Sequence, residues 1–204
     1  MTAGTSTMTD VAGPGPASAN KYEERAFGFW LYLMSDGIIF ALLFATYVVM
    51  LGNTAGGPTG KDLFSLDRAA AETALLLLSS TTFGFAAVAT AAGERSRVLL
   101  WLTVTVLLGL GFLFLEYGEF SGMIAQGAGP DRSGFLSAFF TLVGTHGLHV
   151  SIGSLCILVM IGQVLVKGLT TPVVSRLARL GLFWHFLDIV WVAIFSVVYL
   201  PGLL

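Results

Sequence analysis

Eight ionisable side chains interrupt the apolar stretches of this chain, and their types are those that bind metal ions or move protons. Six of them form pairs with i, i+3 spacing, which places each pair on one face of a helix. Carboxylates and imidazoles on several helices are the ligands of di-iron and haem sites, so a metal centre is the first hypothesis to weigh. The eight are Asp36, Glu72, Glu116, Glu119, His146, His149, His185 and Asp188.

The composition of the chain places these groups in a membrane. Of 204 residues, 55% are apolar and 11% are charged, and the mean hydropathy is +0.85. Such values exclude a soluble globular domain, a disordered chain and a fibrous protein. The formal charge of −2 leaves no basic surface for nucleic acid, and the single Cys156 supports neither a disulfide framework nor a cysteine-ligated metal site. We therefore expect an integral membrane protein.

Five long apolar stretches predict an all-α bundle of five transmembrane helices. Each approaches the roughly 20 residues that cross a ~30 Å hydrocarbon layer as a helix, which satisfies its own backbone hydrogen bonds in lipid. Sequences rich in Gly, Pro and charge separate the stretches, as is typical of loops. The expected helices are about 27–51, 70–92, 98–120, 134–166 and 180–202, in a membrane domain over 26–204 that follows a flexible cytoplasmic tail over 1–25.

The distribution of Lys and Arg predicts the orientation of this bundle. The tail and the second and fourth loops carry seven of these cations, whereas the first and third loops carry three. Cytoplasmic loops are enriched in Lys and Arg. We therefore expect the N-terminus inside and, after five crossings, the C-terminus outside.

The depth of each ionisable group argues against one centre that uses all of them. At 1.5 Å per residue, with every helix started at its nearest loop, Asp36, His185 and Asp188 lie ~15, ~7 and ~12 Å from the inner surface. The same count puts His149 in the inner half and His146 near the middle. The glutamates come out towards the outer surface, ~15 to 20 Å from the histidines. Two separate sets follow: an intramembrane polar cluster of Asp36, His146, His149, His185 and Asp188, and outer-side carboxylates Glu72, Glu116 and Glu119.

Three hypotheses compete for the intramembrane cluster. His149 and His185, on two helices at compatible levels, would suit a haem with two imidazole ligands in a stand-alone membrane protein. Asp36 and Asp188 could form the ion site of a small transporter, although the absence of an internal repeat argues against this. The same groups can also satisfy one another by charge-assisted hydrogen bonds. We favour this last, structural interpretation, and the depth of the groups also permits a proton-related role. We expect no catalytic, cofactor-binding or metal-binding residue in the chain.

The remaining polar and aromatic groups have simple structural explanations. Glu72 and Glu119 are expected to be boundary carboxylates, wetted by lipid headgroups or paired with Arg68 or Arg132. Aromatic residues near the expected helix ends, Trp184 among them, are interpreted as interfacial anchors.

Two segments of the chain resemble the subunit III family of haem–copper terminal oxidases. The stretch 144–154 reads GTHGLHVSIGS, which is similar to that family's helix with paired histidines, and 183–202 reads FWHFLDIVWVAIFSVVYLPG, similar to its last helix. By this match Asp36 in LMSDGIIF takes the place of a family Glu, and Glu119 that of a Glu before an aromatic residue. The terminal motif is carried by Trp184, His185, Asp188 and Trp191. The resemblance covers about 27–204.

The resemblance implies a supporting role in a larger enzyme. Five helices look most like the bo-type ubiquinol oxidase branch of the family, with five-helix bacterial cytochrome c oxidases as the alternative. On this basis the chain carries no haem, copper or quinone; haems and copper belong to the catalytic subunit I, its expected partner together with the other oxidase subunits. We expect a location in the bacterial cytoplasmic membrane and bound phospholipid in grooves between helices.

Overall fold

The structure is a computed structural model that describes the backbone of residues 16–203 and the side chains of 27–61 and 63–201. Within these residues it is all-α. Five helices are long and apolar enough to cross a membrane, which confirms the expected number of spans. The elements are α1 (Pro16–Met50), α2 (Gly60–Leu63), α3 (Leu66–Ala91), α4 (Arg95–Ala125), α5 (Gly134–Lys167), α6 (Thr171–Ile194), the π-helical η1 (Phe195–Tyr199) and α7 (Leu200–Leu203).

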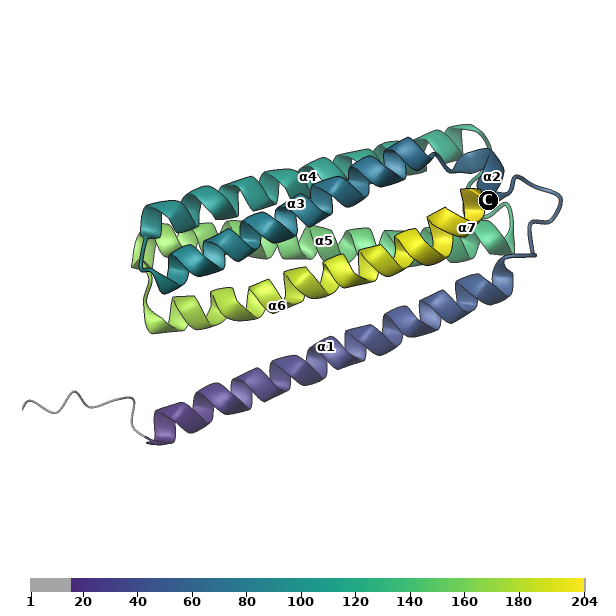
Figure 1. Ribbon diagram of the computed structural model, residues 1–204. Helices are drawn as coiled ribbons and strands as arrows, with labels where there is room; N and C mark the ends of the chain where they lie inside the picture. The colour runs from purple at the N-terminus through teal and green to yellow at the C-terminus, as the bar shows by residue number, and fades with distance from the viewer. Residues whose placement is uncertain (1–15, 204) are drawn as a thin grey trace, which may run out of the picture.

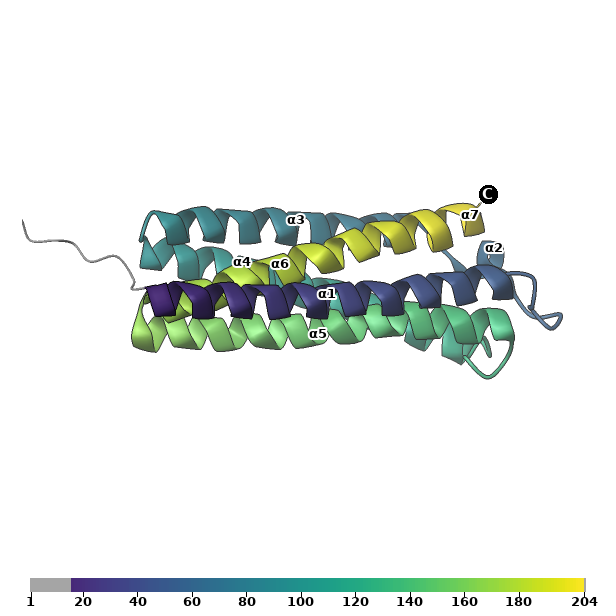
Figure 2. The same ribbon diagram turned by 90° about the horizontal axis from the view of Figure 1, so that it is seen from below.

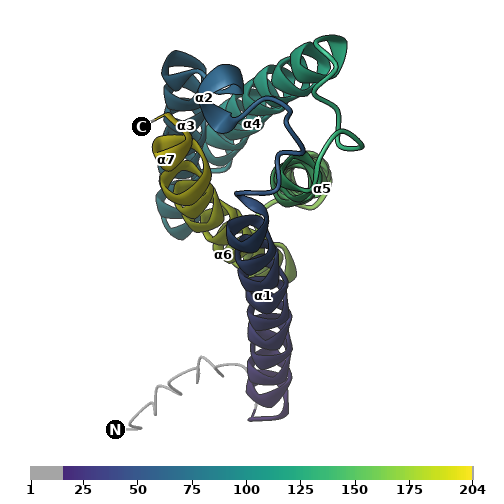
Figure 3. The same ribbon diagram turned by 90° about the vertical axis from the view of Figure 1, so that its right-hand side faces the viewer.

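The helices α3, α4, α5 and α6 pack side by side as a bundle, with α1 on one flank (Figures 1 and 3). Their long axes run in nearly the same direction (Figure 2). Helix α1 makes most of its contacts with α5 and α6 and leans away from them towards its N-terminal end (Figure 1). Because α1 leans away from α5 and α6, grooves can form on either side of it.

The connections alternate between the two ends of the bundle. The α1–α3 and α4–α5 connections lie at the end that also holds α2 and α7, here called the α2 end (Figure 1). They are tied together there, because Phe135 N donates to Asn53 O at 3.1 Å. The α3–α4 turn and the α5–α6 loop lie at the opposite end, where Arg95 donates to the Leu165 carbonyl. The beginning of α1 and the end of the described chain therefore lie at opposite ends.

Several helices extend beyond the ranges expected from the sequence. Helix α1 begins at Pro16, so the second part of the expected tail is helical, while residues 1–15 lie outside the described residues. Helix α4 continues to Ala125, and α6 begins at Thr171 with Pro172 in its first turn. The expected boundaries followed charged residues, but charges at the lipid boundary do not end a helix. Proline in a first turn, by contrast, is a start signal.

Glycines allow α6 to pack closely against its neighbours around Trp184. A Cβ atom on Gly153 of α5 would lie 2.9 Å from the Trp184 ring, and one on Gly109 of α4 would lie 3.0 Å from it. Trp184 is 1% exposed, and its Nε1 donates to Ser79 Oγ of α3 at 3.1 Å. This ring therefore contacts three helices, and it packs in the core instead of at the interface where an anchor was expected.

Candidate functional site

Asp36 and His149 form a contact between α1 and α5. The His149 Nε2 and Asp36 Oδ2 atoms are 3.4 Å apart, and His149 Nδ1 lies 2.7 Å from the Thr145 carbonyl oxygen. Since a carbonyl oxygen only accepts, Nδ1 donates and Nε2 faces the carboxylate. The ring of Phe40 covers the pair, with its centroid 5.2 Å from that of His149. Both nitrogens of His149 thus contact groups of the chain itself.

His185 and Asp188 form a second contact, on α6. His185 Nδ1 is 2.7 Å from Ser80 Oγ of α3 and 3.8 Å from Asp188 Oδ2, one turn further along α6. Asp188 is buried, whereas the His185 side chain is 44% exposed. The hydroxyl of Ser80 joins this pair to α3. The arrangement resembles the Asp36 pair in kind, one imidazole with one carboxylate, but it uses different helices.

No hydrogen bond or ion pair of the described residues joins the Asp36–His149 pair to the His185–Asp188 pair. The expected contact between His185 and Asp188 is present, but Asp36, expected to join them, contacts His149 instead. The aromatic ring of Phe40 contacts His149 on one side and Phe186 of α6 on another. In the part of the chain that the structure describes, no three metal-binding side chains come together. The arrangement supports helix pairing.

Three buried glutamates, Glu72, Glu116 and Glu119, are here called the third polar group together with His146, and the depth arithmetic placed them differently. The carboxyl of Glu116 packs on the backbone of Gly147, since a Cβ atom there would lie 2.5 Å from both of its oxygens. Gly147 follows His146, so the expected separation of the glutamates from the histidines is wrong for Glu116. The cause is the length of α4. It continues nine residues beyond Glu116, which places that carboxyl about 14 Å from the helix end.

Most polar atoms of this third group have no hydrogen-bond partner within the described residues. Both oxygens of Glu72 and of Glu116 and both nitrogens of His146 are buried and unpaired. Glu119 is the exception, because Tyr199 Oη donates to its Oε2 at 2.8 Å. Tyr199 ends the π-helical segment η1, which shifts the register of the last helix there. Buried polar atoms without protein partners call for bound water, a shared proton or another ligand.

The expected partners of the glutamates do not make ion pairs with them. Among the described residues, no ion pair within 4.0 Å joins Glu72 or Glu119 to Arg68 or Arg132. Arg68 is exposed, and Glu72 has no exposed surface. The expectation that lipid headgroups wet Glu72 and Glu119 is therefore wrong, because both side chains are buried within the bundle.

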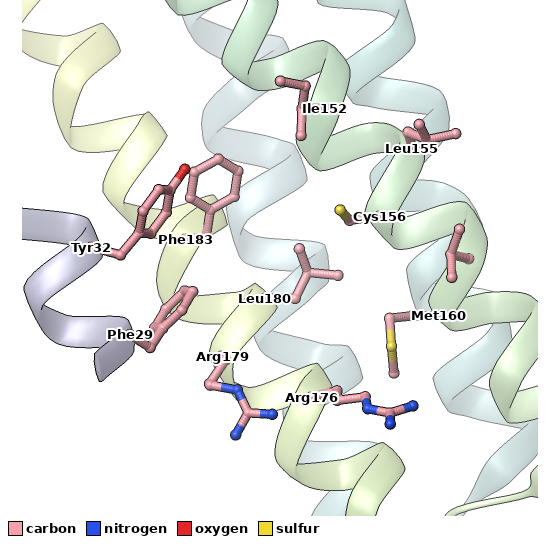
Figure 4. Close-up of a pocket in the computed structure, with 11 residues that line it drawn as sticks. Phe29, Tyr32, Ile152, Leu155, Cys156, Met160, Arg176, Arg179, Leu180 and Phe183 are labelled. Carbon is pink, nitrogen blue, oxygen red and sulfur yellow. The ribbon is translucent and has the colours of Figure 1, made fainter. Parts of the chain in front are cut away.

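A groove between α1, α5 and α6 lies near the α3–α4 end of the bundle (Figure 4). Its volume is about 430 Å³. Two guanidinium groups, Arg176 and Arg179, lie at one end of it, and aromatic and aliphatic side chains from all three helices line the rest (Figure 4). Arg176 donates to Gln163 Oε1 at 2.8 Å and Arg179 to Ser175 Oγ at 2.9 Å. Each arginine has further donors that point to no carboxylate of the described chain.

Comparison with known proteins assigns the chain to a family. The model of the family described as cytochrome c oxidase subunit III matches residues 17–203. The chain belongs to this family. It is 54% identical over 178 residues to the cytochrome bo(3) ubiquinol oxidase subunit 3 of Pseudomonas aeruginosa, covering 87% of this chain and 85% of that protein. It is 56% identical over 177 residues to the protein of the same name from Pseudomonas putida, covering 87% and 86%.

More distant relatives carry names that differ in the electron donor. The quinol oxidase subunit 3 of Bacillus subtilis is 42% identical over 176 residues, covering 86% of both chains. The cytochrome c oxidase subunit 3 of Bacillus sp. strain PS3 is 40% identical over 195 residues, covering 96% of this chain and 94% of that protein. Identity at this level therefore does not separate quinol from cytochrome c oxidases, and the more similar Pseudomonas proteins carry more weight.

Sequence reasoning missed the hydroxyl groups that hold this subunit III chain together. Trp191 Nε1 donates to Thr73 Oγ1 at 3.1 Å, as Trp184 does to Ser79, and the hydroxyls of Thr82 and Thr105 pair at 2.8 Å. Ser and Thr are common in membrane helices, and their spacing gave no signal. The two Trp residues of the terminal motif were the available signal, because a buried indole N–H needs an acceptor.

Proposed function

We propose that the chain is a non-catalytic accessory subunit of a bo-type ubiquinol oxidase in the aerobic respiratory chain. One observation carries the proposal: the two Pseudomonas relatives named as subunit 3 of that enzyme are 54% and 56% identical over most of both chains. The alternative, a cytochrome c oxidase subunit, is favoured by a relative at 40% identity. The enzyme as a whole would oxidise ubiquinol, reduce oxygen and translocate protons.

The polar pairs act in this proposal as connections between helices. Asp36 with His149 joins α1 to α5, and the Ser80 hydroxyl joins the His185–Asp188 pair to α3. Both imidazoles already use Nδ1 within the chain, and His149 Nε2 faces Asp36. This supports the structural role over a haem between His149 and His185. Haems and copper then belong to the catalytic subunit, which a rigid neighbouring bundle stabilises against local opening.

We further propose that the groove of Figure 4 holds a phospholipid. An acyl chain would lie on the apolar lining between α1 and α5, and the headgroup phosphate would contact Arg176 and Arg179, whose guanidinium groups match phosphate oxygens in geometry. Both arginines lie at the end of the bundle that the excess of Lys and Arg assigns to the cytoplasm. The N-terminus would then be inside and the C-terminus outside.

Purification of the tagged chain from native membranes tests the accessory role. We expect the catalytic haem–copper subunit to copurify with it, and ubiquinol oxidase activity to accompany the complex. The matched control is the same tagged chain expressed in a strain without the catalytic subunit, where the purified chain should show no Soret band. A haem spectrum at one haem per chain in that control would contradict the proposal and support the stand-alone haem protein.

A further inference from the structure

His185 lies at the midpoint of the last membrane-spanning helix and is not fully covered by the chain. The span runs from Thr171 to Tyr199, so fourteen residues flank His185 on each side. At 1.5 Å per residue this is about 21 Å from either end. The expected depth of ~7 Å from the inner surface is therefore wrong, because α6 begins at Thr171 and not near 180. The side chain is nevertheless 44% exposed. An imidazole is therefore presented on the surface of the bundle at the middle of this span.

Only one nitrogen of this imidazole is used within the described chain. Both Ser80 and Asp188 approach Nδ1, at 2.7 Å and 3.8 Å. The Nε2 atom is left for a hydrogen bond with something outside these contacts. Acyl chains have no donor or acceptor, and an unsatisfied polar atom in hydrocarbon is costly. Ionisable groups within spans accordingly face protein or a water-filled cavity.

Two hollows flank His185 on the surface of the bundle. A hollow of about 360 Å³ lies between α1 and α6, and one of about 340 Å³ lies between α3 and α6. Leu182 and His185 line both, so they form the ridge between the two hollows. Five small residues are among those that line these hollows. They are Gly37, Ala87, Ala91, Ala178 and Gly181. Small residues allow the backbone of a second helix to approach closely.

The exposed side chains of α4 show a different pattern at comparable depth. Leu107, Leu110, Phe114 and Tyr117 are all exposed and large, and Tyr117 alone of these four carries a polar atom. Tyr117 lies eight residues from the end of α4, where the hydroxyl can reach the interface. Bulky apolar residues without a central polar group are typical of a surface that faces lipid. The two sides of the bundle are thus built for different neighbours.

We propose that the face of α6 around His185, with its two flanking hollows, docks a transmembrane helix of another oxidase subunit. That helix places a hydrogen-bonding side chain against His185 Nε2 and inserts apolar side chains into the hollows between α1 and α6 and between α3 and α6. The inference rests on the chain being part of a multisubunit oxidase and specifies which face meets the partner. A polar side chain on a protein helix is favoured over lipid because the unpaired nitrogen lies at mid-depth.

Site-specific photo-crosslinking in the intact complex tests the docking face while leaving His185 in place. A photoreactive benzoylphenylalanine replaces Ile189, which is 69% exposed beside the α1–α6 hollow, and the matched control replaces Phe114 of α4, 77% exposed. We expect Ile189 to form an adduct with another oxidase subunit, identified by mass spectrometry, and Phe114 to form none. Adducts only with lipid, an adduct with a second copy of this chain, or equal adducts from both positions would overturn the proposal.

Two replacements of His185 separate an external from an internal role. In Gln the amide group reaches the position of Nε2, whereas in Asn it reaches only that of Nδ1. We expect His185→Gln to keep the chain in the detergent-purified complex and His185→Asn to reduce its content about tenfold, since a buried hydrogen bond across the interface is lost. The opposite order would show that only the contact with Ser80 matters and would overturn the proposal.

The outcomes distinguish this inference from the proposed function. If the chain serves a different oxidase, the Ile189 adduct still forms, but with a subunit of that enzyme. If the docking face is wrong, the tagged chain still copurifies with the ubiquinol oxidase, and the Ile189 position gives no subunit adduct.

Discussion

At the scale of single residues, three buried carboxylates contact an imidazole or a phenol and, among the described residues, form no ion pair with lysine or arginine. Asp36 and Asp188 face imidazoles, and Glu119 accepts from the Tyr199 hydroxyl. The ion pair that contains an arginine joins Arg97 to Glu94 at a helix end. Partners without a permanent charge can be replaced by neutral groups of the same shape with little cost. Apolar replacements leave a donor unpaired.

Asp188 provides a direct test of this difference. We expect Asp188→Asn to leave haem content and quinol oxidation of the purified complex nearly unchanged, because the amide keeps the shape and hydrogen-bonding capacity. Asp188→Leu removes the carboxylate that lies 3.8 Å from His185 Nδ1, at a cost of about 1 to 3 kcal/mol, and should release the subunit more readily without altering the spectrum. Loss of turnover in Asp188→Asn with the subunit still bound would instead assign Asp188 a chemical role.

Tyr199 tests the third polar group. Tyr199→Phe removes the hydroxyl that donates to Glu119 and leaves a buried carboxyl group unpaired. We expect the subunit to lose about 1 to 3 kcal/mol of stability, measured as a lower temperature for its release from the complex. Tyr117→Phe is the matched control, because that side chain is exposed. Equal release temperatures for the two variants would show that the Tyr199–Glu119 bond contributes nothing.

The two arginines of the groove give a prediction about bound lipid. Replacing both Arg176 and Arg179 by Gln removes the charges available to a phosphate while keeping polar groups at the groove end. We expect the purified complex to retain less phospholipid, by about one molecule per subunit, as measured by mass spectrometry of extracted lipid. Arg97→Gln is the control, because Arg97 pairs with Glu94 away from the groove. Unchanged lipid content in the double variant would rule out this site.

At the scale of the helices, close packing around Trp184 fixes α6 against α4 and α5. A methyl group on Gly153 would lie 2.9 Å from the ring, whereas one on Gly162, on the same helix, would meet no atom within 4 Å. Alanine has the higher helix propensity, by about 1 kcal/mol. The same substitution should therefore have opposite effects at the two positions of α5.

We expect Gly153→Ala to destabilise the subunit by about 1 to 3 kcal/mol through overpacking and Gly162→Ala to stabilise it by up to about 1 kcal/mol. The temperature at which each variant leaves the purified complex measures both effects. A stabilising effect at Gly153 would mean that the α5–α6 contact is looser than the structure describes.

The number of membrane-spanning helices was predictable from the sequence. The residues at which they begin and end, and the contacts between their polar side chains, were predicted only in part. Hydrophobicity alone marks five spans, because lipid requires about 20 apolar residues in a row. It does not mark the ends of α4 and α6, which continue past the charged or polar boundary. A shift of a few residues moved Glu116 from the surface to the level of His146. Trp184 was misplaced for the same reason, since α6 begins thirteen residues before it.

At the scale of the whole molecule, an odd number of crossings separates the two ends of the described chain. The α1–α3 and α4–α5 connections share one end, where Gly134 also approaches Met50 of α1. Because the two connections are joined, they must face the same compartment. The packing of the helices thus places both connections on one side of the membrane, and the Lys and Arg counts predict which side that is.

Cysteine labelling in spheroplasts tests that choice. In a Cys156→Ser background, Ala55→Cys places a thiol in the α1–α3 connection and Pro130→Cys places one in the α4–α5 connection, both at exposed positions. Seven cations on the opposite side against three here predict that these two connections lie outside, so a membrane-impermeant maleimide should label both. Ser96→Cys, exposed in the first turn of α4 at the other end, should react only after the membrane is permeabilised. Because the α1–α3 and α4–α5 connections are held together, labelling of one without the other would contradict the arrangement of the helices. Labelling of Ser96→Cys alone in intact spheroplasts would reverse the orientation and place Arg176 and Arg179 outside.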